Sequence, residues 1–489
     1  MAVSQHIGSG SRPRGVGDWS EGYSSLNEEH AYWVEDIEGE VPVGLRGTLF
    51  RNGPGRFERG GVAYKHPFDG DGMICALTFT GDRVHFRNRF VRTEGYVQES
   101  AAGRILFKNV FGTLKPGGFW NNAFDFSFKN VANTNVILYA GKLLALWEAA
   151  PPYRLEPRTL GTMGLDELDG TLHPGLPFSA HPKLDPFSGN LLNFGVRTVP
   201  GLSPQSTLDL YRITPEGQVI TDSTHTVPGL AFIHDFACTE NYYIFLQNPM
   251  ALDPLPFLLG WKGAGECLRL AEGVPMRILL VPRAGGPLIT VETEPFFVFH
   301  HVNAFERDGR VVVDSVRYEE YLSAPADRDF RQTDFTQVPP GRVWRTEIDL
   351  GRGRAETRAL CERPTEFPQV HPERVGRPYR YAYLGTTHSA RDNAPLQAIL
   401  KLDTETGHEQ IYSFAPVGFV GEPVFVPRPD ATREDDGWLL VLVYLSDEHR
   451  SEFVILDASD LDRPPLTRLK LKHHVPYGLH GTFTSEVFC

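Results

Sequence analysis

The stretch "GWLLVLVYLSDEHRSEFVILDAS", residues 437–459, joins runs rich in Val, Leu and Ile through a short polar segment. Similar runs recur along the chain, for example in "NVILYAGKLLALWEA" (135–149) and "GRVVVDSVRY" (309–318). Each strand candidate is about four to eight residues long. Turn sequences such as "YAGKL", "ERDGR" and "TETG" lie between them. Long amphipathic helical patterns are scarce, and we expect short helices only near residues 111–130 and 254–271. The pattern predicts an all-β protein.

The length of the chain narrows the choice of β architecture. Its 489 residues exceed an ordinary compact domain, but one large repetitive β fold can contain them. No break in composition suggests a domain boundary, so we favour a single β-propeller. Two β-sandwich domains remain the alternative, and the number of blades does not follow from the pattern. We expect residues 1–20, which are polar and rich in Gly and Ser, to form a flexible tail before one domain at 21–489.

Charge and cysteine usage exclude several classes of protein. The formal net charge is −13, which argues against a nucleic-acid partner. The cysteines number five and never form a Cys-x-x-Cys pair, which fits a reducing cytosol. No apolar run reaches the roughly 18 residues of a membrane span, and the N-terminal segment lacks the apolar region of a signal peptide. We expect a cytoplasmic protein without a signal peptide or a transmembrane helix.

The stretch "FVFHHVNAFE", residues 297–306, carries two adjacent histidines in a run typical of a strand. Neighbouring residues of a strand point to opposite faces, so His300 and His301 cannot do the same job. Three other histidines share the setting of small or apolar residues before and a turn or a specific polar residue after: His181, His234 and His480. They are far apart in sequence. A single site built from His181, His234, His300 and His480 needs a fold that brings distant segments to one axis.

Three glutamates stand in notably apolar surroundings: Glu148, Glu366 and Glu422. Taken singly, each fits a carboxylate at a strand end or turn. Taken with the histidines, they fit the role of hydrogen-bond acceptors that support metal ligands, because imidazole ligands usually donate their second ring N–H to a carboxylate or carbonyl. Neutral imidazoles suit Fe(II), Cu or Zn, and four of them with open positions favour redox chemistry with O₂ over zinc hydrolysis. The residues alone therefore predict a buried metal site without deciding the metal.

Many ordered motifs together resemble the carotenoid cleavage oxygenase family, and in particular its cyanobacterial members. They include "GTLFRNGPGRFE", "KHPFDGDGM", "KNVANTN", "AHPKLDP", "FIHDF", "EFPQVHP", "GEPVFVPRP" and "HHVPYGLHG", and they run almost from end to end of the chain. The resemblance implies a seven-bladed β-propeller with a cap of loops and short helices over one axial Fe(II). It also implies O₂ as co-substrate.

The resemblance assigns a role to each candidate residue. The family pattern Phe-His-x-x-Asn selects His300 as a ligand and leaves His301 as its variable neighbour. His181, His234, His300 and His480 are thereby the four iron ligands, and Glu148, Glu366 and Glu422 are their outer-shell supports. Thr134 matches a threonine near an otherwise open coordination position. Six further residues match the wall of the family's substrate tunnel: Phe68, Trp147, Phe232, Phe299, Tyr318 and Phe367.

The expected reaction is dioxygenase cleavage of the central 15,15′ double bond of an apocarotenal or apocarotenol, giving retinal and a shorter carbonyl fragment. The main rival is a stilbene-cleaving member of the same family, of the resveratrol or lignostilbene type. Those relatives tend to place a lysine before the first outer-shell glutamate, whereas this chain has Trp147, which favours a polyene. An isomerohydrolase and a non-catalytic carotenoid-binding propeller are further alternatives.

An apolar substrate raises the question of where the protein finds it. Residues 110–126 and 254–263 are the best candidates for an exposed apolar patch near the tunnel mouth. Such a patch would dip into one leaflet of a membrane without spanning it. The alternative is that both segments are packed cap helices. We expect a monomer with peripheral membrane association.

Overall fold

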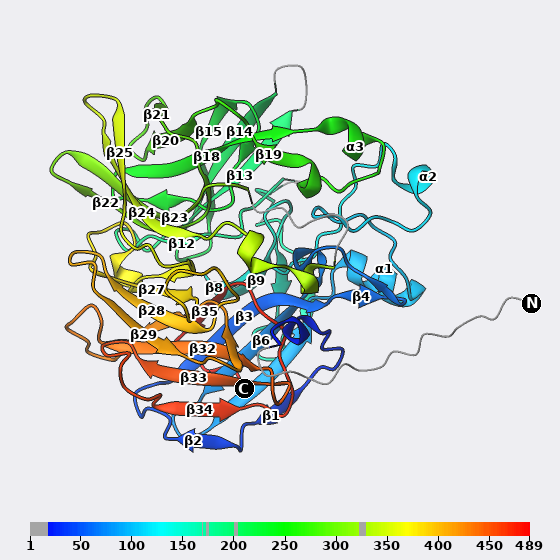
Figure 1. The fold of residues 1–489 in the computed structure, drawn as a ribbon, viewed down its shortest axis with the longest axis vertical. Coiled ribbons are helices and arrows are strands. Elements are labelled where there is room, and N and C mark those ends of the chain that lie inside the picture. The colour runs from blue at the N-terminus through cyan, green and yellow to red at the C-terminus, as the bar shows by residue number, and fades with distance from the viewer. Residues whose placement is uncertain (1–17, 169, 173–175, 200–203, 322–328) are drawn as a thin grey trace, which may run out of the picture.

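The computed structural model describes residues 18–168, 170–172, 176–199, 204–321 and 329–489. In this part of the chain, seven sheets of four to six strands form a seven-bladed β-propeller, as the resemblance implied (Figure 1). Most of the expected N-terminal tail lies outside the described residues. Trp19, within the expected tail, packs edge to face on Phe335 with ring centroids 5.1 Å apart.

The blades follow one another along the chain, and each sheet consists mainly of consecutive antiparallel strands. Blade 1 contains β1 (Ala31–Trp33), β3 (Gly47–Arg56), β6 (Asp71–Phe79), β7 (Val84–Phe90) and β35 (Gly481–Thr484). Blade 2 contains β8 (Asn135–Tyr139), β9 (Lys142–Leu146), β10 (Tyr153–Leu155) and β11 (Thr162–Leu165). Blade 3 contains β12 (Lys183–Leu184), β13 (Leu191–Val199), β14 (Gln205–Ile213) and β15 (Val219–Pro228). Blade 4 contains β16 (Ala231–Phe232), β17 (Ala237–Cys238), β18 (Tyr242–Leu252), β19 (Leu268–Leu270), β20 (Met276–Pro282) and β21 (Ile289–Thr293).

The remaining blades complete the ring. Blade 5 contains β22 (Phe297–Arg307), β23 (Arg310–Tyr318), β24 (Arg342–Asp349) and β25 (Arg354–Ala359). Blade 6 contains β26 (Thr365–Gln369), β27 (Tyr381–Thr386), β28 (Ala398–Asp403) and β29 (Glu409–Ser413). Blade 7 contains β2 (Ile37–Gly39), β30 (Gly418–Val420), β31 (Val424–Pro427), β32 (Gly437–Leu445), β33 (Arg450–Asp457) and β34 (Thr467–Lys470). A separate hairpin joins β4 (Glu58–Arg59) to β5 (Val62–Ala63).

Helices are few and short. The α-helices are α1 (Glu94–Ala102), α2 (Phe119–Asn122) and α3 (Pro254–Leu258). The 3₁₀ turns are η1 (Ser20–Tyr23), η2 (Pro67–Asp69), η3 (Gly265–Cys267), η4 (Phe330–Gln332), η5 (Phe335–Gln337) and η6 (Pro372–Arg374). None of the helices in the described ranges is long and apolar enough to cross a membrane.

Helix α1 lies outside the two regions where the sequence predicted helices. Its end signals are nevertheless present in the sequence. The Thr93 side chain accepts a hydrogen bond from the Tyr96 backbone N–H, and Gly103 ends the helix in the left-handed conformation with φ 64°. The helix has only a weakly apolar face, so the periodicity that identifies most helices is missing.

The stretch at residues 437–459 forms β32 and β33, and its nearly continuous apolar run has a clear cause. Leu440 and Ile455 pack into the core shared with blade 1, where they join residues such as Leu49. Val441 and Val454 belong to the core shared with blade 6, which includes Ile399. Because both faces of the blade are buried against neighbouring blades, the side chains that point to either face of these strands are apolar.

Both ends of the chain take part in closing the ring. Strand β35 pairs with β3 in blade 1, and β2 pairs with β34 in blade 7. Figure 1 shows this second pairing as a blue strand beside a red one. Segments more than 400 residues apart in sequence are therefore adjacent in space, as the hydrogen bond from the Asn52 N–H to the His480 carbonyl shows.

The close approach of β35 to β3 gives a first testable prediction. A Cβ atom at Gly481 would lie 2.4 Å from the backbone oxygen of Phe50, which is too close for any real contact. We expect Gly481→Ala to push β35 away from β3 and to lower the thermal denaturation midpoint. Because His480 immediately precedes this residue, the variant should also lose bound metal.

The matched control is Gly351→Ala. A Cβ atom at Gly351 would meet its nearest neighbour, a side-chain oxygen of Asp349, at 3.5 Å. Circular dichroism melting and metal analysis of both variants would check the prediction. Equal midpoints and equal metal content would contradict it.

Candidate metal centre

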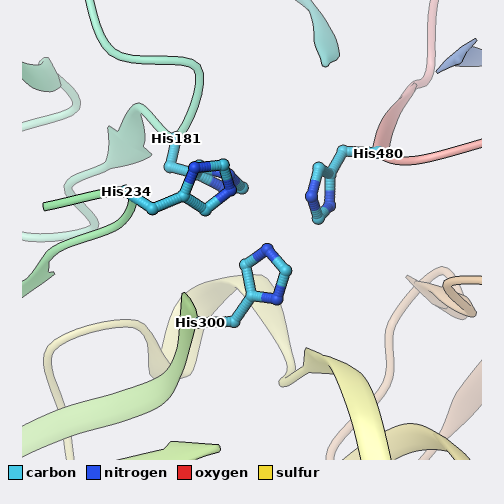
Figure 2. A group of neighbouring side chains, drawn as sticks. All are labelled: His181, His234, His300 and His480. Carbon is cyan, nitrogen blue, oxygen red and sulfur yellow. The ribbon is translucent and has the colours of Figure 1, made fainter. Parts of the chain in front are cut away.

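Four histidines from four different blades meet at the centre of the ring (Figure 2). His181 precedes β12, His234 lies between β16 and β17, His300 lies in β22, and His480 precedes β35. One ring nitrogen of each histidine lies within 4.8 Å of the corresponding atoms of the other three. His181, His300 and His480 are each less than 10% exposed. The structure thus brings together all four histidines that the sequence singled out.

The other three blades each supply one carboxylate to these histidines. Glu148 Oε2 of blade 2 lies 2.6 Å from His234 Nδ1. Glu366 Oε2 of blade 6 lies 2.6 Å from His300 Nδ1, and Glu422 Oε1 of blade 7 lies 2.9 Å from His480 Nδ1. A carboxylate at Nδ1 holds the proton on that nitrogen and leaves the lone pair of Nε2 free.

The donor set fits one metal ion. The Nε2 atoms of His181 and His234 lie 2.9 Å apart, and the buried Nε2 of His300 has no hydrogen-bond partner. Metal–imidazole bonds are about 2.0–2.1 Å long, so two nitrogens on opposite sides of one ion lie about 4 Å apart and two on adjacent sides lie closer. The 2.9 Å between the His181 and His234 nitrogens therefore fits two neighbouring ligands of one ion. Burial, with the neighbouring imidazoles, lowers the pKa of His181 well below its usual value. The ring is therefore neutral, as a ligand must be.

Glu366 is held by an unusual segment of backbone. Phe367 adopts a left-handed conformation with φ 57°, and its N–H donates to Glu366 Oε2 at 2.5 Å. Strain of this kind clusters at functional sites. Tyr318 donates its hydroxyl to Glu366 Oε1 at 2.7 Å, and Gln369 donates to Glu422 Oε1 at 2.9 Å. From the sequence, Tyr318 was expected only in the tunnel wall, and Gln369, in the motif "EFPQVHP", was not predicted to take part in the site.

The adjacent histidines of β22 have different partners. The pairing of β22 with β23 shifts register on both sides of His301. His300 faces the centre, whereas the His301 ring is buried and its Nδ1 lies 2.7 Å from the Ser315 hydroxyl. Asn303 donates to the backbone carbonyls of Arg374 and Arg377 and so holds the turn after η6. Only one histidine of the pair therefore reaches the centre.

A cavity of about 350 Å³ opens onto three of the four histidines, His234, His300 and His480. Thr134 lines this cavity, and its backbone oxygen accepts a hydrogen bond from the His480 N–H. The six expected tunnel residues also line it: Phe68, Trp147, Phe232, Phe299, Tyr318 and Phe367. Several further aromatic residues of the wall were not predicted from the sequence: Trp19, Tyr23, Phe111, Phe335, Phe419 and Tyr477. Tyr477 and Phe111 lie within segments named above, but no pattern in the sequence distinguishes them from aromatic residues of the core.

The fold and the site together define a β-propeller with an axial site of four histidines and three carboxylates. The family described as retinal pigment epithelial membrane protein matches residues 23–485. The chain is 51% identical to apocarotenoid-15,15′-oxygenase of Synechocystis, over 95% of its own length and 96% of the relative's. It is 31% identical to lignostilbene-alpha,beta-dioxygenase isozyme III of Sphingomonas paucimobilis, over 92% and 93% of the two chains.

Solved structures agree with the sequence comparison. The crystal structure of cobalt-substituted Synechocystis ACO matches with a TM-score of 0.93 and 51% identity, covering 96% of this chain and 98% of that one. The chain belongs to the retinal pigment epithelial membrane protein family, which is the carotenoid oxygenase family that the motifs resemble.

Substitution of the adjacent histidines of β22 tests the site without any substrate. We expect His300→Ala to lower metal content at least about tenfold, because it removes a ligand and leaves Glu366 without its partner. His301→Ala should keep the metal, because the wild-type His301 ring contacts Ser315 rather than the histidines of the metal centre. Metal analysis of both purified variants after loading with Fe(II) checks the prediction. Equal loss of metal from the two variants would contradict it.

Proposed function

We propose that this protein is an Fe(II)-dependent oxygenase that cleaves the central 15,15′ double bond of apocarotenals or apocarotenols, giving retinal and a shorter carbonyl fragment. The observation that carries the proposal is the apolar cavity that opens onto a cluster of four histidines through His234, His300 and His480. The 51% identity to the Synechocystis apocarotenoid-15,15′-oxygenase supports the choice of substrate. That a related protein exists in a cobalt-substituted form supports the presence of a metal.

The proposed metal ligands are His181, His234, His300 and His480. When bound there, Fe(II) would supply the activation of O₂. In this proposal Glu148, Glu366 and Glu422 keep the imidazoles in the tautomer that presents Nε2 to the metal. Thr134 lines the cavity and its carbonyl accepts the His480 N–H, so in this proposal it would limit access to the metal.

The aromatic wall would bind the substrate and decide which bond reacts. A polyene is a rigid apolar rod, and Phe, Tyr and Trp side chains bind such a surface by burial and ring stacking. Phe299 and Phe367 lie beside the histidines, with ring centroids 5.5 Å from His234 and 5.9 Å from His300 respectively. The depth to which the rod enters then determines which double bond lies at the metal.

One aerobic assay tests the reaction and the substrate class together. The Fe(II)-loaded protein is given an apocarotenal and, in a parallel reaction, resveratrol, and the products are identified by absorbance and mass. We expect retinal from the apocarotenal and no aldehydes from resveratrol, because an apolar Trp147 lines the cavity next to Glu148.

A sample treated with an iron chelator is the control and should give no retinal. Aldehydes from resveratrol alone would assign the protein to the stilbene-cleaving class. The absence of any product from an iron-loaded sample would favour a non-catalytic carotenoid-binding protein or an isomerohydrolase.

We also infer that the protein approaches a membrane through an apolar patch, which we define as Trp120, Phe124, Phe126, Leu255 and Trp261. These side chains are 58–89% exposed. They belong to α2, α3 and the residues that follow them, and the two helices lie side by side at the edge of the molecule (Figure 1). The Phe124 N–H donates to the Leu258 carbonyl at 2.8 Å, which joins the two segments into one surface. Such a patch suits insertion into one leaflet of a bilayer.

Liposome sedimentation tests the apolar patch. Burial of one large aromatic side chain favours binding by at least about tenfold, so Trp120→Ser and Trp261→Ser should each weaken binding by about that factor. The control is Val43→Ser, which alters an apolar side chain that is 93% exposed between β2 and β3. Equal sedimentation of all the variants and the wild type would contradict the membrane role.

A further inference from the structure

The motif "KHPFDGDGM", residues 65–73, contains a carboxylate that the proposed chemistry does not use. Asp69 ends η2 and is 1% exposed. Its Oδ1 accepts the backbone N–H of Phe111 at 3.0 Å, and its Oδ2 accepts that of Thr113 at 2.9 Å. Both donors belong to the cap loop, which we define as residues 109–113. A charge-assisted bond from each oxygen is a strong way to hold two amides in place.

Further contacts join the same two segments. The Asn109 side chain donates to the Asp69 carbonyl at 3.1 Å, and the Lys65 N–H donates to the Thr113 hydroxyl at 2.8 Å. Phe111 stacks on the ring of His66 at 4.9 Å and meets Phe68 edge to face at 5.5 Å. Residues 109, 111 and 113 of the cap loop are thus fastened to residues 65–69.

The backbone of Phe68 is also held by a residue next to the metal centre. Asn133, the neighbour of Thr134, donates to the carbonyls of Phe68 and Gly70, both at 2.8 Å. Phe68 and Phe111 both line the cavity. A continuous chain of contacts therefore runs from the cap loop through η2 to the metal centre.

We propose that Asp69 is a positioning residue for substrate binding, which holds Phe111 of the cap loop against Phe68 so that the two rings form one wall of the cavity. The inference rests on the proposed function, because it concerns binding of the apolar substrate in that cavity. Without the Asp69 carboxylate, the amides of Phe111 and Thr113 lose their acceptor and the wall loses its fixed shape. Binding of the polyene then weakens while the metal centre stays intact.

A separate set of ion pairs holds α1 and the segment that follows it. Asp71, two residues further on, pairs with Arg59 at 2.7 Å and with Lys129. Lys129 also pairs with Glu99 of α1 at 2.8 Å, and Glu99 accepts the N–H groups of residues 106 and 107. Because this network anchors α1 and the segment after it, removal of the Asp69 charge frees the cap loop locally and leaves these neighbouring segments in place.

The charge on Asp69 itself depends on pH. Burial raises the pKa of Asp69 to about 6, although the amides of Thr113 and Phe111 act in the opposite direction. The negative charge of Glu266 in η3 also raises the pKa of Asp69. Lys65 is the cation of the same motif. Burial lowers the pKa of His66 to about 3, so this neighbouring ring is neutral. As the pH falls through about 6, a proton occupies one oxygen and removes an acceptor from the cap loop.

The test variant is Asp69→Asn, which keeps the size of the side chain but replaces one acceptor oxygen with an NH₂ donor. We expect amide hydrogen exchange in residues 110–113 to become about tenfold faster, since a hydrogen bond to a charged group is lost. The KM for an apocarotenal should rise about tenfold, with kcat within about twofold of wild type and metal content unchanged. The ratio of the KM of Asp69→Asn to the KM of the wild type should fall toward one below pH 6, where wild-type Asp69 is itself protonated.

The matched control is Asp82→Asn, an exposed aspartate of blade 1 whose carboxylate binds the Thr80 hydroxyl. It should leave exchange, KM and kcat unchanged. Unchanged amide exchange in Asp69→Asn would overturn the proposal. Faster exchange would also overturn it if KM stayed unchanged or if the variant lost its metal. If the wild-type protein does not cleave apocarotenals, the proposed function fails, and quenching of tryptophan fluorescence by the bound polyene replaces KM as the readout for Asp69.

Discussion

Closure of the seven-bladed ring is the constraint on which the rest of the structure depends. The metal centre takes one histidine from each of four blades and one glutamate from each of the other three, so no part of the ring can be missing. His480 reaches the centre because β35, from the end of the chain, pairs with β3 near its beginning. The Gly481 N–H then donates to Glu422 Oε2 at 2.9 Å, which joins blade 1 to blade 7 at the axis. The strand pairing that closes the fold therefore also completes the site.

Burial of polar groups at the axis is compensated by partners from neighbouring blades. An unpaired carboxylate in such surroundings would be costly. Glu422, 3% exposed, accepts from Gln369, His480 and Gly481 and lies 3.5 Å from Arg51. Each of these contacts crosses a boundary between blades. The same hydrogen bonds that stabilise the ring orient the imidazoles, so the geometry of the site follows from the stability of the fold.

Much of the architecture could be predicted from local patterns, and the exceptions have identifiable causes. Short apolar runs and turn residues correctly predicted an all-β protein. Helix α1 was missed because its apolar face is weak, although Thr93 and Gly103 marked its ends. The partner of His301 could not be predicted, because a register shift in β22 changes the alternation of side chains. The left-handed backbone at Phe367, φ 57°, has no signal in residue type, since such a conformation is rare for a phenylalanine.

The sequence by itself determined the all-β class and, through its ordered motifs, the family and the four histidines. These features depend on residue type and order, which a linear chain displays directly. Only the tertiary structure decided which carboxylate contacts which histidine, which further aromatic side chains line the cavity beside the six expected ones, and that Asp69 binds the cap loop. Those properties arise where segments from different blades meet, and hydrogen-bond distances between such segments exist only after the ring has closed.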